Sequence, residues 1–186
     1  VGAGLRGPLK GGRAADTLVR LGDAEIRTFD PHLFTELASA RVAADQFVGL
    51  TRFDGRGQVI PALAEKWEVS ADGLNWRFPV RAGLRFSDGA PITAAVIVGS
   101  IARMRDPKTA STHAAMAINI LSVAEAPTAN GAGAVTFQLA KPYPDLPGLL
   151  AHAAFAAVPL HRIQALGEGW TNERPLVTSG PYRAAE

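Results

Sequence analysis

The four histidines are the side chains in this sequence best suited to bind a metal ion or to act in acid–base catalysis. They are His32, His113, His152 and His161, and no two stand at a metal-ligand spacing such as H-E-x-x-H. His152 and His161 flank short apolar segments, where a hydrogen-bonded structural role is the commoner one. The pattern therefore indicates no metal site.

The other reactive groups lack the context that their chemistry requires. No serine lies in a G-x-S-x-G motif, and Ser100 falls within a predicted helix rather than at a strained turn. Asp23 and Glu25 are close in sequence, but solvated loop acids are far commoner than an acid–base pair. The segment 2–7 matches G-x-G-x-x-G, yet no strand precedes it and Pro8 follows directly. The sequence thus predicts no catalytic residue and no cofactor.

Composition describes a globular chain of about one domain. The 186 residues are 47% hydrophobic and 19% charged, and the formal net charge of +2 gives little support to nucleic-acid binding. There is no cysteine, which excludes disulfides and thiolate chemistry. The longest apolar run, at 153–160, is too short to span a bilayer. Because the chain begins at Val1 rather than Met, we expect that a leader was removed and that the protein is exported.

The elements with the clearest pattern are a strand, a turn and a helix within 76–105. Trp76, Phe78 and Val80 alternate with polar or turn-forming residues at the period of a half-buried strand. Trp67 lies on a second predicted strand, and both tryptophans are predicted to be core residues. Trp170, in a glycine-rich loop, is either a lid over a ligand or a side chain docked onto its own domain.

The turn and the start of the helix have recognisable chemistry. Asp88 can bond its own backbone and Gly89 supplies a positive φ. Thr93 is predicted to be the N-cap, with its hydroxyl accepting from an amide two or three residues on. The helix that follows has apolar residues at helical spacing, namely Ile97, Ile101 and Met104.

The remaining elements alternate irregularly between helix and strand. A second amphipathic helix is predicted over 36–49, with Leu37, Ala40, Ala44, Phe47 and Val48 on its buried face. Strands are predicted at 17–22, 51–53, 59–60, 67–69, 121–126, 134–139 and 155–158, and helices at 61–66 (one turn), 109–120, 146–152 and 160–166. This order predicts an α/β domain with a mixed sheet.

Two blocks of sequence carry a resemblance to a known family. Residues 61–74 read PALAEKWEVSADGL and residues 86–94 read FSDGAPITA, and shorter matches such as Asp30-Pro31-His32, 106–111 and 179–182 follow in the same order. In these blocks the chain resembles the extracytoplasmic solute-binding proteins of ABC importers, in the family that handles peptides, oligopeptides, nickel and some sugars (family 5). The resemblance covers almost everything from Thr17 to Arg183.

The resemblance implies a two-lobed fold of the type II periplasmic-binding-protein class, with ligand between the lobes. It divides the chain into a flexible, basic, glycine-rich tail (1–16), part of the lobe I core (17–49 and 168–186) and an inserted α/β subdomain (50–167). The second lobe would follow residue 186. Such a fragment is expected to bind ligand weakly or not at all, because one wall of the cleft is missing.

Two positions depart from the family pattern. The family usually carries an acidic residue where this chain has Val96, so a favourable charge near the helix N-terminus is lost. Pro79 interrupts the strand after Phe78, which predicts that this strand lies at a sheet edge or next to a bulge.

The function implied by the resemblance is capture of a solute, short peptides first, and its delivery to an ABC permease in the inner membrane. Residues carried over from oligopeptide-binding relatives to the ligand site are Thr35, Glu36 and the segment from Ala114 to Met116; a core role for Met116 is equally open. The protein is expected to be periplasmic, monomeric when complete, and not an enzyme. Nickel, sugar or another small solute, a small hydrolase, and a standalone interaction module remain alternatives.

Overall fold

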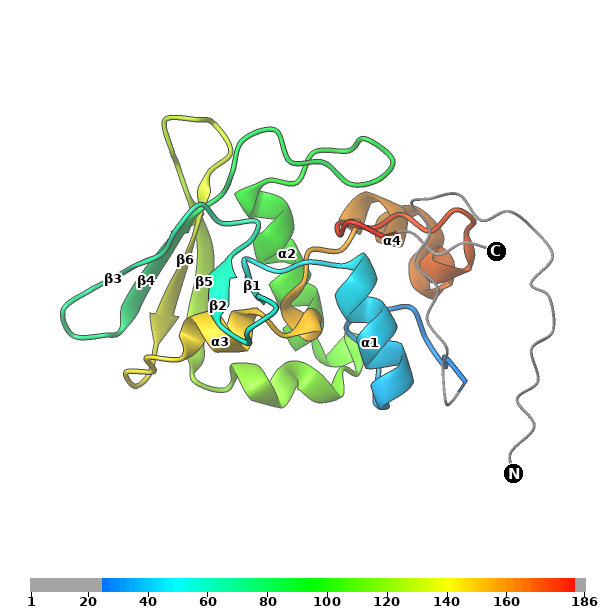
Figure 1. Cartoon of the computed structure of the whole chain (residues 1–186), viewed down its shortest axis with the longest axis horizontal. Coiled ribbons are helices and arrows are strands. Elements are labelled where there is room, and N and C mark those ends of the chain that lie inside the picture. The colour runs from blue at the N-terminus through cyan, green and yellow to red at the C-terminus, as the bar shows by residue number, and fades with distance from the viewer. Residues whose placement is uncertain (1–24, 183–186) are drawn as a thin grey trace, which may run out of the picture.

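The structure is a computed structural model that describes residues 25–182 (Figure 1). A sheet forms one end of the molecule, helix α2 (Ala94–Arg105) packs against it, and helices α1 (Leu37–Gln46) and α4 (Leu160–Leu166) lie toward the other end. The expected tail at 1–16 and the predicted strand at 17–22 lie outside the described residues. The α/β class is confirmed.

The main sheet has four strands in the order β3-β4-β6-β5, and a separate hairpin is formed by β1 and β2. All pairings between these strands are antiparallel, so a parallel part of the expected mixed sheet is not among the described strands. The strands are β1 (Thr51–Phe53), β2 (Val59–Pro61), β3 (Glu68–Val69), β4 (Asn75–Pro79), β5 (Ile120–Ala126) and β6 (Ala134–Leu139).

The core lies between this sheet and α2. Alternation places Trp76 and Phe78 of β4 on the inner face, where Phe78 meets Phe137 of β6 edge-on at 5.5 Å between ring centroids. The apolar face predicted for α2 is fully buried and packs against these aromatic side chains. Burying each such side chain contributes about 1.5–3 kcal/mol, so this contact is a large contribution to the domain's stability. The α2 residues are Ile97, Ile101 and Met104.

The prediction that Pro79 lies on an edge strand is wrong, whereas its alternative, a nearby bulge, agrees with a one-residue register shift between the Ala64–Val80 bridge and the Glu68–Arg77 pair. Strand β4 lies between β3 and β6, and its pairing with β6 is regular as far as Pro79 and Ala134. The carbonyl of Pro79 accepts from the Glu65 amide at 2.8 Å, so the missing N–H of this residue faces the segment before β3 rather than β6. No ladder bond to β6 is therefore lost.

The turn before α2 is confirmed, and the cap is confirmed in part. Gly89 has φ +91°, and Asp88 Oδ1 accepts from the Ala90 amide at 3.1 Å. Thr93 is the N-cap residue, but its side chain makes no capping bond. The first helical amide, that of Ala94, is instead satisfied by the Ala132 carbonyl at 3.0 Å, so a loop next to β6 takes part in the capping.

Helix α1 is confirmed, but only part of the face predicted to be buried is so: Phe47, directly after the helix, is 2% exposed and Val48 is half-buried. Within the helix the buried residues are Ser39, Ala43 and Gln46, whereas Leu37 is 62% exposed. The Ser39 hydroxyl accepts from the backbone amides of the segment before the helix, those of Arg27 and Thr28. Because these amides need an acceptor, the serine rather than the apolar stripe faces inward.

Two further predicted elements differ in kind. At 61–66 the chain is extended rather than helical, because the Leu63 and Ala64 amides bond to the carbonyls of Gly49 and Leu50. The predicted helix at 109–120 is replaced by the 3-10 helices η1 (Pro107–Thr109) and η2 (Thr112–Ala117), separated by Ala110 at φ +53°. The Ser111 side chain accepts from the His113 amide and begins the second of them.

The predicted strand at 155–158 is buried but forms no ladder. The Ala157 amide bonds to the Val48 carbonyl, and its own carbonyl accepts from Ser179 Oγ, so two different chain segments satisfy its backbone. The helix expected at 146–152 is present over a shorter range, and that at 160–166 ends at Gly167 as predicted. The short helices of this region are α3 (Leu146–Leu150), η3 (Ala153–Phe155) and η4 (Gly167–Asn172).

Candidate functional site

The two segments expected to contact ligand lie next to each other. Thr35 and Glu36 precede α1, and Ala114 and Met116 lie in η2. His113 Nε2 is 2.9 Å from the Phe34 carbonyl oxygen, which requires the proton on Nε2. A second hydrogen bond links the same two regions, because the Ser111 hydroxyl donates to the His32 carbonyl oxygen at 2.5 Å. The fold therefore joins segments almost eighty positions apart at one place.

The four predicted residues have different surroundings within that place. Thr35 is exposed, while Ala114 and Met116 are half-buried and pack against the main core. Met116 thus packs against the core, as its alternative role as a core residue predicts. Part of its side chain is also exposed, and a ligand could reach that part. Nothing in the contacts of Thr35 commits its hydroxyl to another group among the described residues.

Glu36 has a local structural role as the N-cap of α1. Its carboxylate accepts from the Ser39 side chain, from the Ser39 amide at 3.2 Å and from the Thr35 amide at 3.3 Å. The Ser39 hydrogen bond is the main cause that lowers the Glu36 pKa to about 2, and the Thr35 and Arg27 amides act in the same direction. The side chain therefore holds the helix start in place beside Thr35.

A buried ionic cluster lies beneath the site. Arg103 of α2 forms a two-point ion pair with Asp30, with nitrogen–oxygen distances of 3.1 and 2.6 Å. Trp170 of η4 donates to the same carboxylate, and the Asp30 side chain is only 4% exposed. Burial raises the pKa of Asp30, but the Arg103 hydrogen bond and charge outweigh it and leave this pKa below the ordinary value.

His32 completes the cluster in its neutral form. Arg103 Nη1 lies 2.7 Å from His32 Nδ1 and must donate to it, so the imidazole proton is on Nε2. That nitrogen has no well-formed partner in the described chain, although the Ala156 backbone is close enough to favour the protonated ring slightly. Burial dominates and lowers the His32 pKa to about 4. The cluster fixes the segment that leads into Phe34 and Thr35.

Three rings pack together where the two segments meet. Phe34 is 4.4 Å from His113 and 5.7 Å from His152 between ring centroids, and the two imidazoles are 5.3 Å apart. His152 also has the structural role predicted for it, because its Nδ1 accepts from the Ala154 amide at 3.2 Å and begins η3. Sequence analysis missed this cluster, since no local pattern relates positions 34, 113 and 152.

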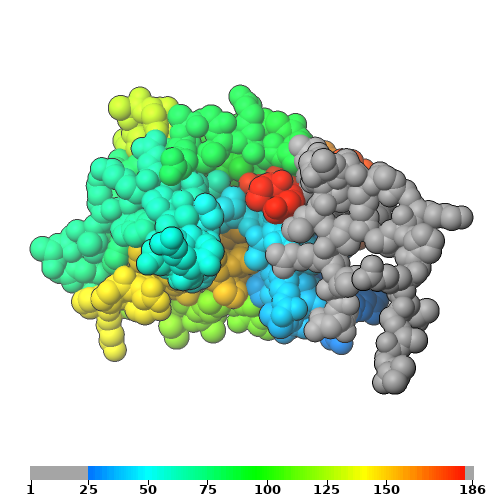
Figure 2. Space-filling model, viewed as in Figure 1, coloured from blue at the N-terminus to red at the C-terminus, as the bar shows by residue number. Residues whose placement is uncertain are grey.

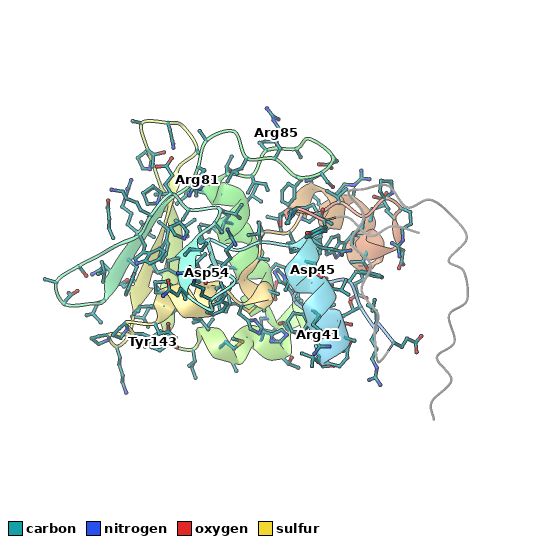
Figure 3. The ribbon with its side chains drawn as sticks, viewed as in Figure 1. Arg41, Asp45, Asp54, Arg81, Arg85 and Tyr143 are labelled. Carbon is teal, nitrogen blue, oxygen red and sulfur yellow. The ribbon has the colours of Figure 1, made fainter. Side chains whose placement is uncertain are left out.

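A groove of ≈ 320 Å³ opens beside the C-terminal end of α1. Its walls are α1, the β1–β2 hairpin and the segment 181–182, and Ala151 and Ala153 on either side of His152 form part of its lining. Figure 2 shows the orange floor between the teal hairpin and blue α1, with the red segment beside it. Arg41 and Asp45 of α1 and Asp54 of the hairpin lie on this face (Figure 3). The apolar stripe predicted for α1 supplies Ala44, Phe47 and Val48 to this groove.

The residues of the sequence signature lie away from this site and are structural. Trp76 is 6% exposed and stacks on Phe78, and Trp67 is half-buried and packs on the same ring. Asp88 pairs with His161 at 2.7 Å, which confirms a structural role for His161. Trp170 is 1% exposed and docked onto its own domain rather than forming a lid.

Neither a metal centre nor a membrane helix is found in residues 25–182. No three histidine or acidic side chains there come together in a way that could hold a metal ion. Every helix in that range also falls short of the length and apolar character needed to cross a membrane.

Comparison with known proteins defines the class. Residues 58–186 match the family model of bacterial extracellular solute-binding proteins, family 5 Middle. The crystal structure of Haemophilus influenzae OppA in complex with the peptide RPPGFSPFR superposes with a TM-score of 0.79 at 26% identity, over 88% of this chain and 34% of that one. The fold is therefore part of an extracellular substrate-binding protein. The chain belongs to family 5 of the bacterial extracellular solute-binding proteins.

Relatives within the family bind peptides, by their names. The periplasmic oligopeptide-binding protein OppA of Salmonella typhimurium is 34% identical over 90% of this chain, and the periplasmic murein peptide-binding protein MppA of Escherichia coli is 33% identical over 89%. The chain spans about a third of the length of these relatives. Its family and relatives are substrate-binding proteins and not enzymes.

Proposed function

We propose that the protein containing this chain is the periplasmic substrate-binding component of an ABC importer that captures short peptides and delivers them to a membrane permease. It makes no covalent change to the peptide and acts as a monomer. The single observation that supports this most is the contact of Phe34 with His113, which unites the two segments that the family resemblance assigns to ligand.

In this proposal Thr35, Ala114 and Met116 contact the solute, and Glu36 acts indirectly by capping α1 beside Thr35. The segments 17–49 and 168–186 belong to the lobe I core, and 50–167 is the inserted subdomain. A second lobe closes over the site by hinge motion when the solute binds. Peptides are favoured over nickel because no group of metal-ligating side chains forms in the described part of the chain.

The experiment is calorimetric titration of the full-length protein with trialanine and a mixed tripeptide panel, and with Ni²⁺ and maltose as the other solute classes. We expect micromolar or tighter binding of peptides only. Binding of Ni²⁺ or maltose without any peptide heat would overturn the peptide assignment. Turnover of a peptide or ester substrate by the pure protein would overturn the assignment as a binding protein.

A further inference from the structure

The two imidazoles at the site each have one ring nitrogen committed to the protein and one left over. His113 uses Nε2–H to donate to the Phe34 carbonyl, so its Nδ1 carries a lone pair. His152 uses the lone pair of Nδ1 to accept from the Ala154 amide, so its Nε2 carries the proton. The protein backbone thus fixes opposite tautomers in two neighbouring rings, which makes one an acceptor and the other a donor.

The leftover nitrogens are open to a ligand. Neither His113 Nδ1 nor His152 Nε2 has a hydrogen-bond partner in the described chain. Neither atom is fully buried, since the fully buried side-chain atoms without a partner in that part of the chain belong to other residues. Both side chains are half-buried, so each ring is held firmly while its free nitrogen reaches the surface. Burial, and secondarily the nearby His113, lower the pKa of His152, which keeps that ring neutral at pH 7.

One donor beside one acceptor is the complement of one residue of an extended chain, whose own N–H and C=O point to the same side. In an antiparallel ladder two residues exchange an N–H···O bond in each direction, and the His113–His152 pair offers the same two functions from side chains. The ring centroids are 5.3 Å apart, so the two rings are close enough to meet neighbouring backbone groups of one extended chain. Phe34, buried beneath both rings, keeps them from turning away.

We propose that His113 and His152 determine specificity by reading the main chain of the solute: His113 Nδ1 accepts from a peptide N–H and His152 Nε2–H donates to a peptide carbonyl. This inference rests on the proposed function, because it names the contacts made at the same site. It selects for an amide backbone and leaves the side chain of the solute free to vary.

Matched variants remove each outward nitrogen and keep the inward bond. In His113→Gln the side-chain amide can still donate to the Phe34 carbonyl, but the Nδ1 acceptor is gone. In His152→Asn the side-chain oxygen can still accept from the Ala154 amide, but the Nε2–H donor is gone. His161→Asn is the control, because His161 pairs with Asp88 away from the site.

The measurement is the calorimetric affinity of the full-length protein for trialanine and for ester analogues in which one backbone N–H at a time is replaced by oxygen. We expect each site variant to weaken trialanine binding about three- to tenfold, with no change in the control. One ester analogue should bind wild type about three- to tenfold more weakly than trialanine. His113→Gln should abolish that difference.

The outcomes separate the inference from the function on which it rests. If wild type binds no peptide, the proposed function fails. If wild type binds trialanine and both variants match it, or if His113→Gln retains the full penalty for every ester, the imidazole pair does not read the peptide backbone. Circular dichroism at the binding temperature verifies that each variant is folded.

Discussion

Trp170 Nε1 donates to Asp30 Oδ2 at 3.1 Å across 140 positions of sequence. The same carboxylate receives both outer nitrogens of Arg103 in α2. One buried acid thus ties the segment before the proposed ligand site to the central helix and to η4. This geometry makes Asp30 the residue on which the position of Phe34 and Thr35 depends.

Replacement of Asp30 by Ala should be strongly destabilising. It would leave Arg103, whose side chain is 15% exposed, and the indole N–H of Trp170 without their acceptor. Breaking a buried ion pair on one side costs about 3–5 kcal/mol. Urea unfolding followed by tryptophan fluorescence measures the change. The matched control is Asp88→Ala, which removes a partly exposed ion pair with His161 and the turn bond from the Ala90 amide, and should cost no more than about 2 kcal/mol. Equal effects for the two variants would contradict a special role for Asp30.

Stability should fall as the pH is lowered from 6.5 to 4. His32 is neutral in the fold with a pKa of about 4, while the unfolded chain binds a proton below its ordinary value of 6.5. The unfolded state therefore binds a proton before the folded state does as the pH falls through this window. The free energy of unfolding decreases by about 3 kcal/mol for the full shift in pKa. Below pH 4 the contribution of His32 is constant, because both states are protonated.

The pH effect is measured by urea unfolding at steps between pH 7 and 4. His152 also has a lowered pKa and acts in the same direction, so the comparison is with His32→Asn, whose side-chain oxygen can accept from Arg103 in place of Nδ1. The variant should show a flatter dependence between pH 6.5 and 4. The assignment to His32 fails if the variant retains the slope of wild type.

The elements predicted correctly from the sequence are those whose burial follows local periodicity. The β4 strand around Trp76, the α2 face of Ile97 and Ile101, and the β5–β6 hairpin bury the residues that alternation or helical spacing selects. The family blocks then identified the class of protein, since their order and spacing are carried by the sequence itself.

The elements predicted incorrectly depend on partners far away in the chain. Periodicity selected the Leu37 face of α1, but the amides of Arg27 and Thr28 require Ser39 inside. In the same way, Phe34, His113 and His152 form one cluster only because η2, η3 and the segment before α1 converge. The tautomers of the two histidines depend on backbone bonds that no spacing reveals.

An acid in the first turn of α2 should stabilise the protein. This turn has no acidic residue, and the family's usual position for one is taken by Val96, which packs against the core. Ala95 beside it is exposed, so Ala95→Glu adds the charge without loss of packing. The expected gain is about 0.3–1 kcal/mol at low salt, and it should shrink in 1 M NaCl. Thermal unfolding compares it with Ala95→Gln, which lacks the charge; a gain of the same size in Gln would contradict the electrostatic cause.

Gly49 should tolerate no side chain, because it lies where three segments meet. A Cβ at this position would stand 2.4 Å from the Leu150 carbonyl oxygen. The oxygen belongs to the backbone and the Cβ is bonded directly to it, so neither atom can rotate away. The Gly49 carbonyl also accepts from the Leu63 amide, which fixes the segment that would have to move. We expect Gly49→Ala to cost about 1–3 kcal/mol in urea unfolding. Gly55→Ala is the control, since a Cβ at Gly55 meets nothing within 4 Å, and its effect should stay within about 0.5 kcal/mol. If both variants unfold at the same urea concentration, the backbone at Gly49 can shift enough to accept a methyl group, and the groove wall at Val48 and Gly49 is softer than its contacts indicate.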